Sequence, residues 1–264
     1  MEARGLNCGG IDWCAPWLAP LARWRARLEA GDWRAALTDA ARERGVVSGR
    51  GEPITFVGAD DAGGTPYELH VAATGRVPTR ANLHDAFNAL AWLAYPRAKA
   101  ALNRRQADEI EARGIGGTRG AVRDAATLID ESALLVASDD AAVFDGLARH
   151  DWRLLLIEWR ARWGREIVPL AFGHALLEKL AGPFKAITAC VVPLPLRGDR
   201  DEAAARFIAR ADLAPPLLAH LPVLGIPGWW AANAAPSFYD DPAVFRAAPG
   251  RARQMRAAQA APNG

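Results

Sequence analysis

The sequence NLHDAFNALAWLAYPRAKAALN, residues 82–103, decides more about the fold than any other stretch of the chain. Its apolar residues recur at helical spacing: Leu83, Phe87, Leu90 and Ala94. Asn82 is a suitable N-cap for this helix. Pro96 predicts that the helix ends or kinks and that a second helix continues over residues 97–113.

The same stretch carries polar side chains beside its apolar stripe. They are His84, Asp85, Asn88, Arg97, Lys99 and Asn103. Ionisable groups next to a core cost free energy unless they find partners, so their presence needs an explanation. We therefore expect a functional site, if there is one, to include this stretch.

The composition is that of a globular protein. The chain has 264 residues, of which 51% are hydrophobic and 23% charged, so it can bury a substantial core. The formal net charge is only +2, and the arginines are spread along the chain. This charge pattern argues against a nucleic-acid partner.

The sequence predicts a cytoplasmic protein without a membrane anchor. Cys8, Cys14 and Cys190 are too few for a disulfide framework or a closed zinc site, and we expect free thiols. The first ten residues lack the basic-then-apolar pattern of a signal peptide. Five prolines interrupt the uncharged segment 213–236, which predicts a buried, extended segment over the core instead of a spanning helix.

Before residue 82, helices precede short strands. Residues 1–45 have apolar residues at helical spacing, and Asp32 is a suitable N-cap for a helix that ends at Gly45. Residues 54–57 and the run from Tyr67 to Ala73 are rich in β-forming residues and predict strands.

After residue 113, glycines 114, 116 and 117 predict a loop. Residues 125–129 and 134–137 flank Asp130, Glu131 and Ser132 and predict a hairpin. Further helices are expected at 139–150, 152–163, 174–181 and 199–211, and further strands at 167–172 and 187–194.

These elements predict an α+β fold, a mainly helical single domain with a small mixed or antiparallel sheet, because helices and strands do not alternate regularly. We expect a flexible N-terminus at 1–10, one globular domain at 11–248 and a disordered tail at 249–264.

Two histidines lie at helical spacing from a possible partner. His84 and Asn88 share one helical face, and so do His174 and Glu178. Gly173 permits a close backbone approach beside His174. Face to face, these pairs would form a catalytic site, with His84, His174 and Glu178 as ligands of a divalent metal ion. The alternative is that both histidines are structural, since no HExxH or CxxC motif is present.

Other polar residues allow two readings each. Arg97, Lys99 and Asn103 follow a helix start and predict a site for a small anionic ligand, or else a solvated helix face. Asp124 and Asp130 are candidate catalytic acids, but carboxylates are also ordinary turn residues.

The aromatic pair Trp229 and Trp230 gives the proline-rich segment two further interpretations. Exposed, the two side chains would bind a ligand or a partner; buried, they would fix the segment to the core.

Five stretches of the chain resemble, in the same order, a proteobacterial family known only as domain of unknown function 3025. They are HDAFNALAWLAYPRAKAALN (84–103), RDAATLIDES (123–132), FGHALLEKL (172–180), LPVLGIPGWW (221–230) and FYDDPAVFR (238–246). The resemblance spans about residues 11–246 and implies a single cytoplasmic module, with no activity or catalytic residue to carry over. Ala133 departs from the glycine expected at that position.

Two functional hypotheses follow. The first is an enzyme, a hydrolase or a metal-assisted catalyst, with a histidine, asparagine and glutamate site between two helices. The second is a non-catalytic protein- or ligand-binding module that uses the aromatic C-terminal segment.

Overall fold

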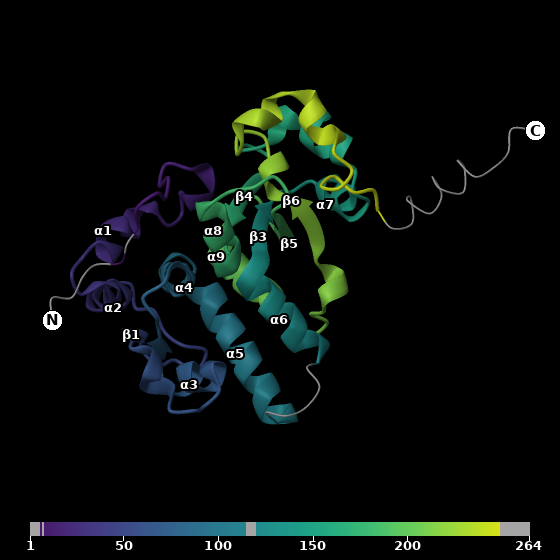
Figure 1. The fold of residues 1–264 in the computed structure, drawn as a ribbon. Coiled ribbons are helices and arrows are strands. Elements are labelled where there is room, and N and C mark those ends of the chain that lie inside the picture. Colours follow the sequence, from purple (N-terminus) through teal and green to yellow (C-terminus); the bar gives the residue numbers. More distant parts are fainter. Residues whose placement is uncertain (1–5, 7, 115–119, 249–264) are drawn as a thin grey trace, which may run out of the picture.

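The computed structural model describes residues 6, 8–114 and 120–248. The expected tail at 249–264, residues 1–5 and 7 of the expected flexible N-terminus and most of the expected glycine loop lie outside the described residues. The described chain is a mixed α+β fold, as the sequence predicted (Figure 1). Helices surround a sheet of four strands, and a separate pair of strands lies near the N-terminal helices.

The N-terminal part is helical, as predicted. Two 3₁₀ turns, Pro16–Leu18 and Ala22–Trp24, precede α1 (Arg25–Leu28) and α2 (Trp33–Glu43). Asp32 caps α2, because its carboxylate accepts a hydrogen bond of 3.1 Å from the amide of Ala35.

The strand predicted from Tyr67 to Ala73 is wrong, because these residues form α3 (Tyr67–Thr74). Pro66 immediately precedes the helix, and Gly75 ends it in the left-handed region with φ of 67°. Around α3, β1 (Thr55–Val57) and β2 (Arg76–Pro78) pair in parallel, and a 3₁₀ turn covers Ala59–Ala62. The predicted strand at 54–57 is confirmed.

The two central helices begin and end as the sequence indicated. Asn82 caps α4 (Leu83–Ala94) by accepting a 2.8 Å hydrogen bond from the amide of Asp85. Pro96 starts α5 (Pro96–Arg113), which contacts α3, α4, α6 (Ala121–Ser132) and α9 (Arg200–Ile208). Because four helices pack against it, α5 is the helix around which this part of the molecule is built (Figure 1).

The predicted hairpin around Asp130 is wrong. Residues Ala121–Ser132 form α6, and β3 (Ala133–Ala137) follows without a turn. The cause is a helical stripe: Ala125, Ala126 and Ile129 are buried together on one face. Ala133 is the first residue of a fully buried strand, which removes the need for a turn glycine at that position.

The main sheet has the strand order β4-β3-β5-β6. Besides β3 it contains β4 (Val168–Ala171), β5 (Thr188–Leu194) and β6 (Ala219–Pro222). Strand β3 runs antiparallel to β4 and parallel to β5, and β5 runs antiparallel to β6, so the sheet is mixed. The predicted strands at 167–172 and 187–194 are confirmed.

Three of the four remaining predicted helices are confirmed. They are α7 (Ala141–Ala148), α8 (His174–Ala181) and α9 (Arg200–Ile208). The fourth, predicted at 152–163, is irregular, with a π-helical turn at Arg153–Glu158 and a 3₁₀ turn at Arg160–Arg162. The amide of Trp159 donates to the carbonyl of Leu154, five residues earlier, which is the hydrogen bond of a π-helix. The carbonyl of Leu155 accepts a hydrogen bond of 2.7 Å from the indole of Trp163.

The proline-rich segment 213–236 is buried in its middle and exposed toward its end, so the expected buried segment is confirmed in part. Residues 221–226 are buried, whereas 231, 232 and 234–236 are exposed. The 3₁₀ turns at Pro215–Leu217 and Val223–Gly225 lie on either side of β6. Two more 3₁₀ turns follow, Ala231–Ala234 and Pro236–Asp240. In the part of the chain that the structure describes, no helix has the length and apolar character needed to span a membrane.

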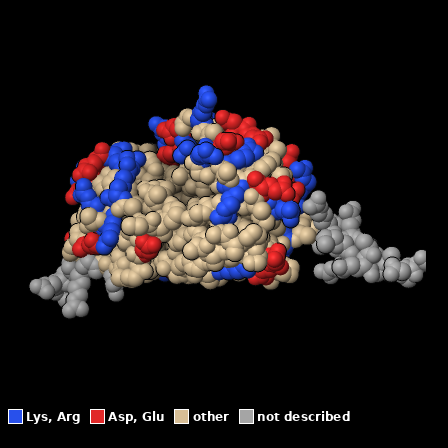
Figure 2. All heavy atoms as spheres, turned by 90° about the horizontal axis from the view of Figure 1, so that it is seen from above, with Lys and Arg blue, Asp and Glu red and all other residues tan. Residues whose placement is uncertain are grey.

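Figure 2 shows one face of the molecule with its charged side chains coloured. Positive and negative side chains are interspersed around a centre that carries mostly uncharged residues, and no continuous basic patch covers this face. The mixture is consistent with the small net charge of +2.

Candidate functional site

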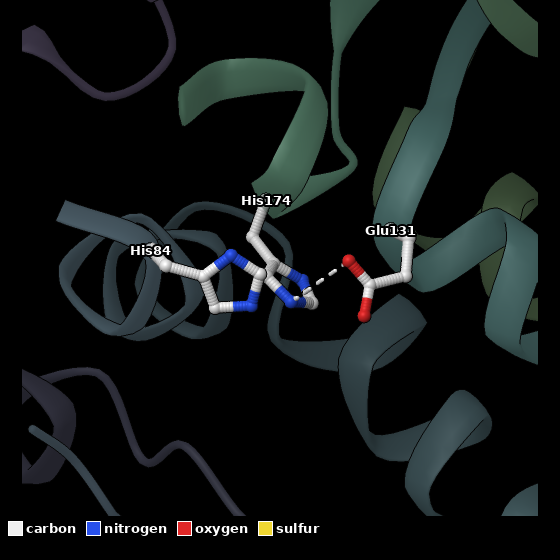
Figure 3. Close-up of side chains that lie close together, drawn as sticks. All are labelled: His84, Glu131 and His174. Carbon is white, nitrogen blue, oxygen red and sulfur yellow. Dashed lines mark ion pairs between the residues drawn. The ribbon is translucent and has the colours of Figure 1, made fainter. Parts of the chain in front are cut away.

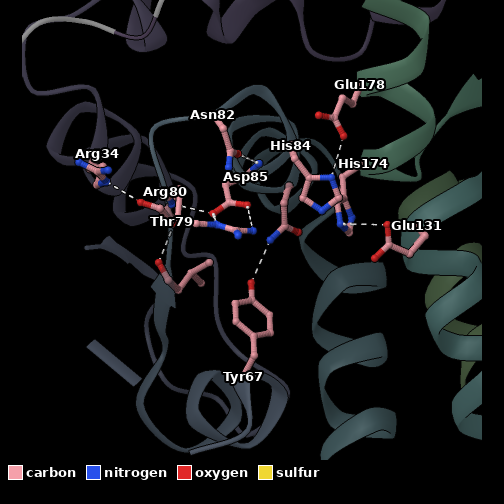
Figure 4. Close-up of polar contacts among 12 residues, drawn as sticks. Arg34, Tyr67, Thr79, Arg80, Asn82, His84, Asp85, Glu131, His174 and Glu178 are labelled. Atoms are coloured by element: carbon pink, nitrogen blue, oxygen red, sulfur yellow. Dashed lines mark hydrogen bonds and ion pairs between the residues drawn. The ribbon is translucent and has the colours of Figure 1, made fainter. Parts of the chain in front are cut away.

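A pocket of about 460 Å³ lies where α3, α4, α6 and α8 meet. The residues that line it include, from these helices, Tyr67, His84, Asp85, Asn88, Asp130, Glu131 and His174. We call it the histidine pocket. It brings together polar side chains that are far apart in the sequence (Figure 4).

The two histidines meet inside this pocket. The rings of His84 on α4 and His174 on α8 lie edge to face, with centroids 4.5 Å apart and planes at 80°. The Glu178 carboxylate, on the same helix as His174, lies 2.8 Å from Nδ1 of His84. That contact is a hydrogen bond that leaves Nε2 of His84 for another partner.

Glu131 completes a cluster with the two histidines (Figure 3). One ligand atom from each of His84, Glu131 and His174 lies within 4.8 Å of the others. Nε2 of His174 is 3.5 Å from Oε2 of Glu131, and Nδ1 of His174 is 3.8 Å from Oδ1 of Asp130. Nδ1 of His174 is buried and has no hydrogen-bond partner among the described residues.

Gly173 brings the cluster together. The amides of Phe172 and Gly173 both bond to the carbonyl of Ala133, which ties the start of α8 to the end of α6. A Cβ at Gly173 would lie 2.5 Å from backbone atoms of Glu131, Ser132 and Ala133. Only glycine allows this approach, and it places His174 beside Asp130 and Glu131.

A chain of polar contacts continues from the cluster along the pocket. Lys99 of α5 is 3% exposed, and its ammonium contacts Oδ1 of Asp130 and, at 2.8 Å, Oδ1 of Asn88. The Asn88 amide nitrogen in turn donates to the hydroxyl of Tyr67 at 2.9 Å. Lys99 also lies 5.5 Å from the centre of the Trp92 ring.

Burial and neighbouring charges set the protonation of the cluster. Burial alone would raise the pKa of Asp130, but the charge of Lys99 and the hydrogen bond from its ammonium group oppose burial, and the pKa is lowered. Burial lowers the pKa of His174, although Asp130 partly opposes this. At neutral pH the pocket therefore holds the ionised carboxylate of Asp130 beside the neutral imidazole of His174. Neutral imidazole is the form of histidine that ligates metal ions.

Asp85 has a different role. It accepts hydrogen bonds from the backbone amide and the guanidinium of Arg80, at 2.6 to 3.0 Å. Burial alone would raise the pKa of Asp85, but the hydrogen bonds from Arg80 outweigh burial, and the pKa is lowered. Arg34 also bonds to the Thr79 carbonyl at 2.8 Å (Figure 4). These contacts fix the loop that leads into α4.

The structure separates the residues expected to bind an anion. Arg97 is at the surface, paired with Asp199 and Glu202, and its backbone amide bonds to Asp201. Lys99 points instead to the histidine pocket. Asn103 accepts a hydrogen bond from the amide of Gly49 and donates one to the carbonyl of Glu68, and so ties the loop at Gly49 and the first turn of α3 to α5.

Three further predicted site residues lie away from the histidine pocket. Asp124 is exposed in the first turn of α6. Trp229 is 7% exposed and packs against Trp17 with ring centroids 5.9 Å apart. Trp230 is partly buried against the same core. The buried alternative for the aromatic segment agrees with these positions.

Sequence reasoning did not predict Glu131 and Tyr67 as members of the histidine pocket. Glu131 was assigned to a turn because residues 125–137 were read as a hairpin. Tyr67 was assigned to a strand, although Pro66 and Gly75 are signals for helix ends. A helical reading of 121–132 would have placed Asp130 and Glu131 at the end of a helix, immediately before a strand.

A family model described as a protein of unknown function (DUF3025) matches residues 54–249. The chain belongs to the DUF3025 family. The matched region contains α3, α4, α5, α6 and α8, which all line the histidine pocket. Searches of curated proteins and of solved structures gave no significant match.

Proposed function

We propose that this member of the DUF3025 family is an enzyme, a hydrolase that binds one divalent metal ion in the histidine pocket through His84, Glu131 and His174. The observation that carries the proposal is the convergence of these three side chains from three helices, with ligand atoms within 4.8 Å of one another.

The donor set fits a zinc-like ion. Two imidazoles and one carboxylate are a common set in catalytic zinc sites, which leave a further position for water or substrate. Ligands about 2 Å from one ion lie about 3.4 Å from each other. The 3.5 Å separation of His174 Nε2 and Glu131 Oε2 is close to that spacing.

The groups behind the ligands support the same reading. The Glu178 carboxylate accepts a hydrogen bond from Nδ1 of His84. A carboxylate in this position orients a metal-bound histidine and increases its basicity. Glu178, which the sequence analysis treated as a ligand, would act here by orienting His84.

A divalent ion in this pocket would polarise water and a carbonyl oxygen. Asp130 is suited to accept a proton from that water, since its lowered pKa keeps it ionised and only its Oδ1 contacts Lys99. In hydrolysis the water oxygen forms a bond to the acyl carbon, the bond to the leaving group breaks, and the proton passes to the leaving group.

Metal binding is the first property to test. Purified full-length chain, stripped with chelator and dialysed against Zn²⁺, should hold about one ion per chain by plasma mass spectrometry. His174→Ala and Glu131→Gln should each lower zinc affinity at least tenfold in calorimetric titration, while the melting temperature changes by a few degrees only.

The control is His220→Ala, which removes an exposed histidine on β6, outside the histidine pocket. It should leave zinc binding unchanged. Wild-type protein that holds no zinc, or loses it equally in the control variant, would refute the proposal.

The free cysteines support a cytoplasmic enzyme. Cys8, Cys14 and Cys190 form no disulfide among themselves, and reduced thiols are usual in a reducing compartment. We place the protein there as part of the same proposal.

A further inference from the structure

The direction of hydrogen bonds along the pocket wall identifies a substrate-binding group. The chain of contacts runs from Asp130 through Lys99 and Asn88 to Tyr67. An ammonium group donates hydrogen bonds and cannot accept them. The Asn88 atom that faces Lys99 is therefore the amide oxygen, and the amide nitrogen faces Tyr67.

This orientation determines what the Tyr67 hydroxyl does. Its oxygen accepts the hydrogen bond from Asn88 at 2.9 Å, so its own proton must point elsewhere. Among the described residues this proton has no acceptor, and Tyr67 lines the histidine pocket. Figure 4 shows Tyr67 extending toward the side chains of α4.

The charges around the pocket indicate what the hydroxyl would bind. Asp85 is paired with Arg80, and Asp130 with Lys99. Glu68 and Glu131 also line the pocket; Glu131 contacts the neutral His174, and among the described residues neither acid is paired with a lysine or an arginine. A divalent ion would balance the two negative charges of Glu68 and Glu131. No excess positive charge would then remain to attract a doubly charged anion such as a phosphate.

We infer that Tyr67 donates a hydrogen bond to the oxygen of a neutral acyl substrate, an amide or an ester, in the histidine pocket. The inference rests on the proposed metal site and names the substrate class for it. When water adds to the acyl carbon, negative charge develops on the former carbonyl oxygen, and a fixed hydroxyl donor stabilises that charge.

The probe is acetohydroxamic acid, which is neutral and offers a carbonyl oxygen next to a metal-chelating oxygen. We expect it to bind the zinc-loaded full-length chain in calorimetric titration, and Tyr67→Phe to weaken binding about tenfold or more. The zinc content, measured on the same samples, should not change.

A second variant tests the direction of the hydrogen bonds without removing the hydroxyl. Asn88→Asp replaces the amide by a group that only accepts, so the Tyr67 proton should turn toward the new carboxylate and away from the pocket. It should weaken hydroxamate binding as Tyr67→Phe does, and the double variant should be no weaker than either single one. Tyr239→Phe, outside the pocket, is the matched control.

The outcomes separate the two proposals. Zinc-free wild type overturns the proposed function and this inference with it. Zinc-loaded Tyr67→Phe that binds hydroxamate as well as wild type overturns the inference alone. Inorganic phosphate that displaces the hydroxamate, with an affinity that falls in Tyr67→Phe, overturns the neutral substrate class.

Discussion

The centroids of the His84 and His174 imidazole rings lie 4.5 Å apart with planes at 80°, although α4 and α8 are separated in the sequence by α5, α6, α7 and two strands of the main sheet. Two imidazolium ions at this distance would repel each other, so the pair favours at least one neutral ring. Burial already keeps the pKa of His174 below its ordinary value.

The first prediction concerns pH. The folded state lowers the pKa of His174, so the unfolded chain takes up a proton more readily as the pH falls below about 6.5. Stability should therefore decrease from pH 7.5 to 5.5. His174→Leu should reduce that decrease, as measured by urea unfolding at both pH values; an equal decrease in both proteins would contradict the pKa direction.

The second prediction concerns the buried ion pair. Lys99→Met would leave Asp130 without its cation and should destabilise the fold by about 3 kcal/mol or more. The double variant with Asp130→Leu should be more stable than Lys99→Met, since no unpaired charge remains. Denaturant unfolding measures the stability of the two single variants and of the double variant. If the loss in the double variant equals the sum of the two single losses, the pair is not coupled.

The third prediction concerns the glycine at the start of α8. Gly173→Ala would place a Cβ 2.5 Å from the backbone of α6 and β3, so α8 must move. We expect a loss of about 2 kcal/mol or more in stability, with lowered zinc affinity. At the other end of α8, a Cβ at Gly182 meets nothing within 4 Å, and Gly182→Ala should leave zinc affinity unchanged.

The fourth prediction distinguishes core from binding surface. Trp229→Ala should cost about 3–5 kcal/mol, because the indole is buried against Trp17. Trp230→Ala should cost clearly less, because that side chain is only partly buried. Thermal unfolding of the two variants measures this difference. A Trp229→Ala protein as stable as wild type would contradict the core role of Trp229 and favour the partner-binding interpretation of the aromatic segment.

Local signals predicted the elements that depend on a few neighbouring residues. Asn82 and Asp32 both cap the helices expected to start after them. The predicted hairpin failed for a physical reason, because alanine, which occurs three times in residues 121–132, favours helices over strands. Burial of Ala125 and Ile129 on one face settled the helix through tertiary packing.

The candidate site was predictable in part, because local helical spacing indicated which side chains share a face. The spacing of His84 and Asn88, and of His174 and Glu178, indicated one face of each helix, and the structure brings these faces together. No local pattern links Lys99 to Asp130, because their contact depends on how α5 packs against α6. Likewise, Glu131 reaches His174 only through the close approach at Gly173.

The strand order β4-β3-β5-β6 has a consequence for synthesis of the chain on the ribosome. Strand β3 is central, yet both of its neighbours are made later. Until β5 emerges, the apolar residues of β3 and α6 have no sheet to cover them, which is the situation in which nascent chains recruit chaperones. Lys99 and Asp130 are both synthesised before α8, whereas His84 meets His174 only after α8 has been made, so the histidine pocket is completed late in the synthesis of the chain.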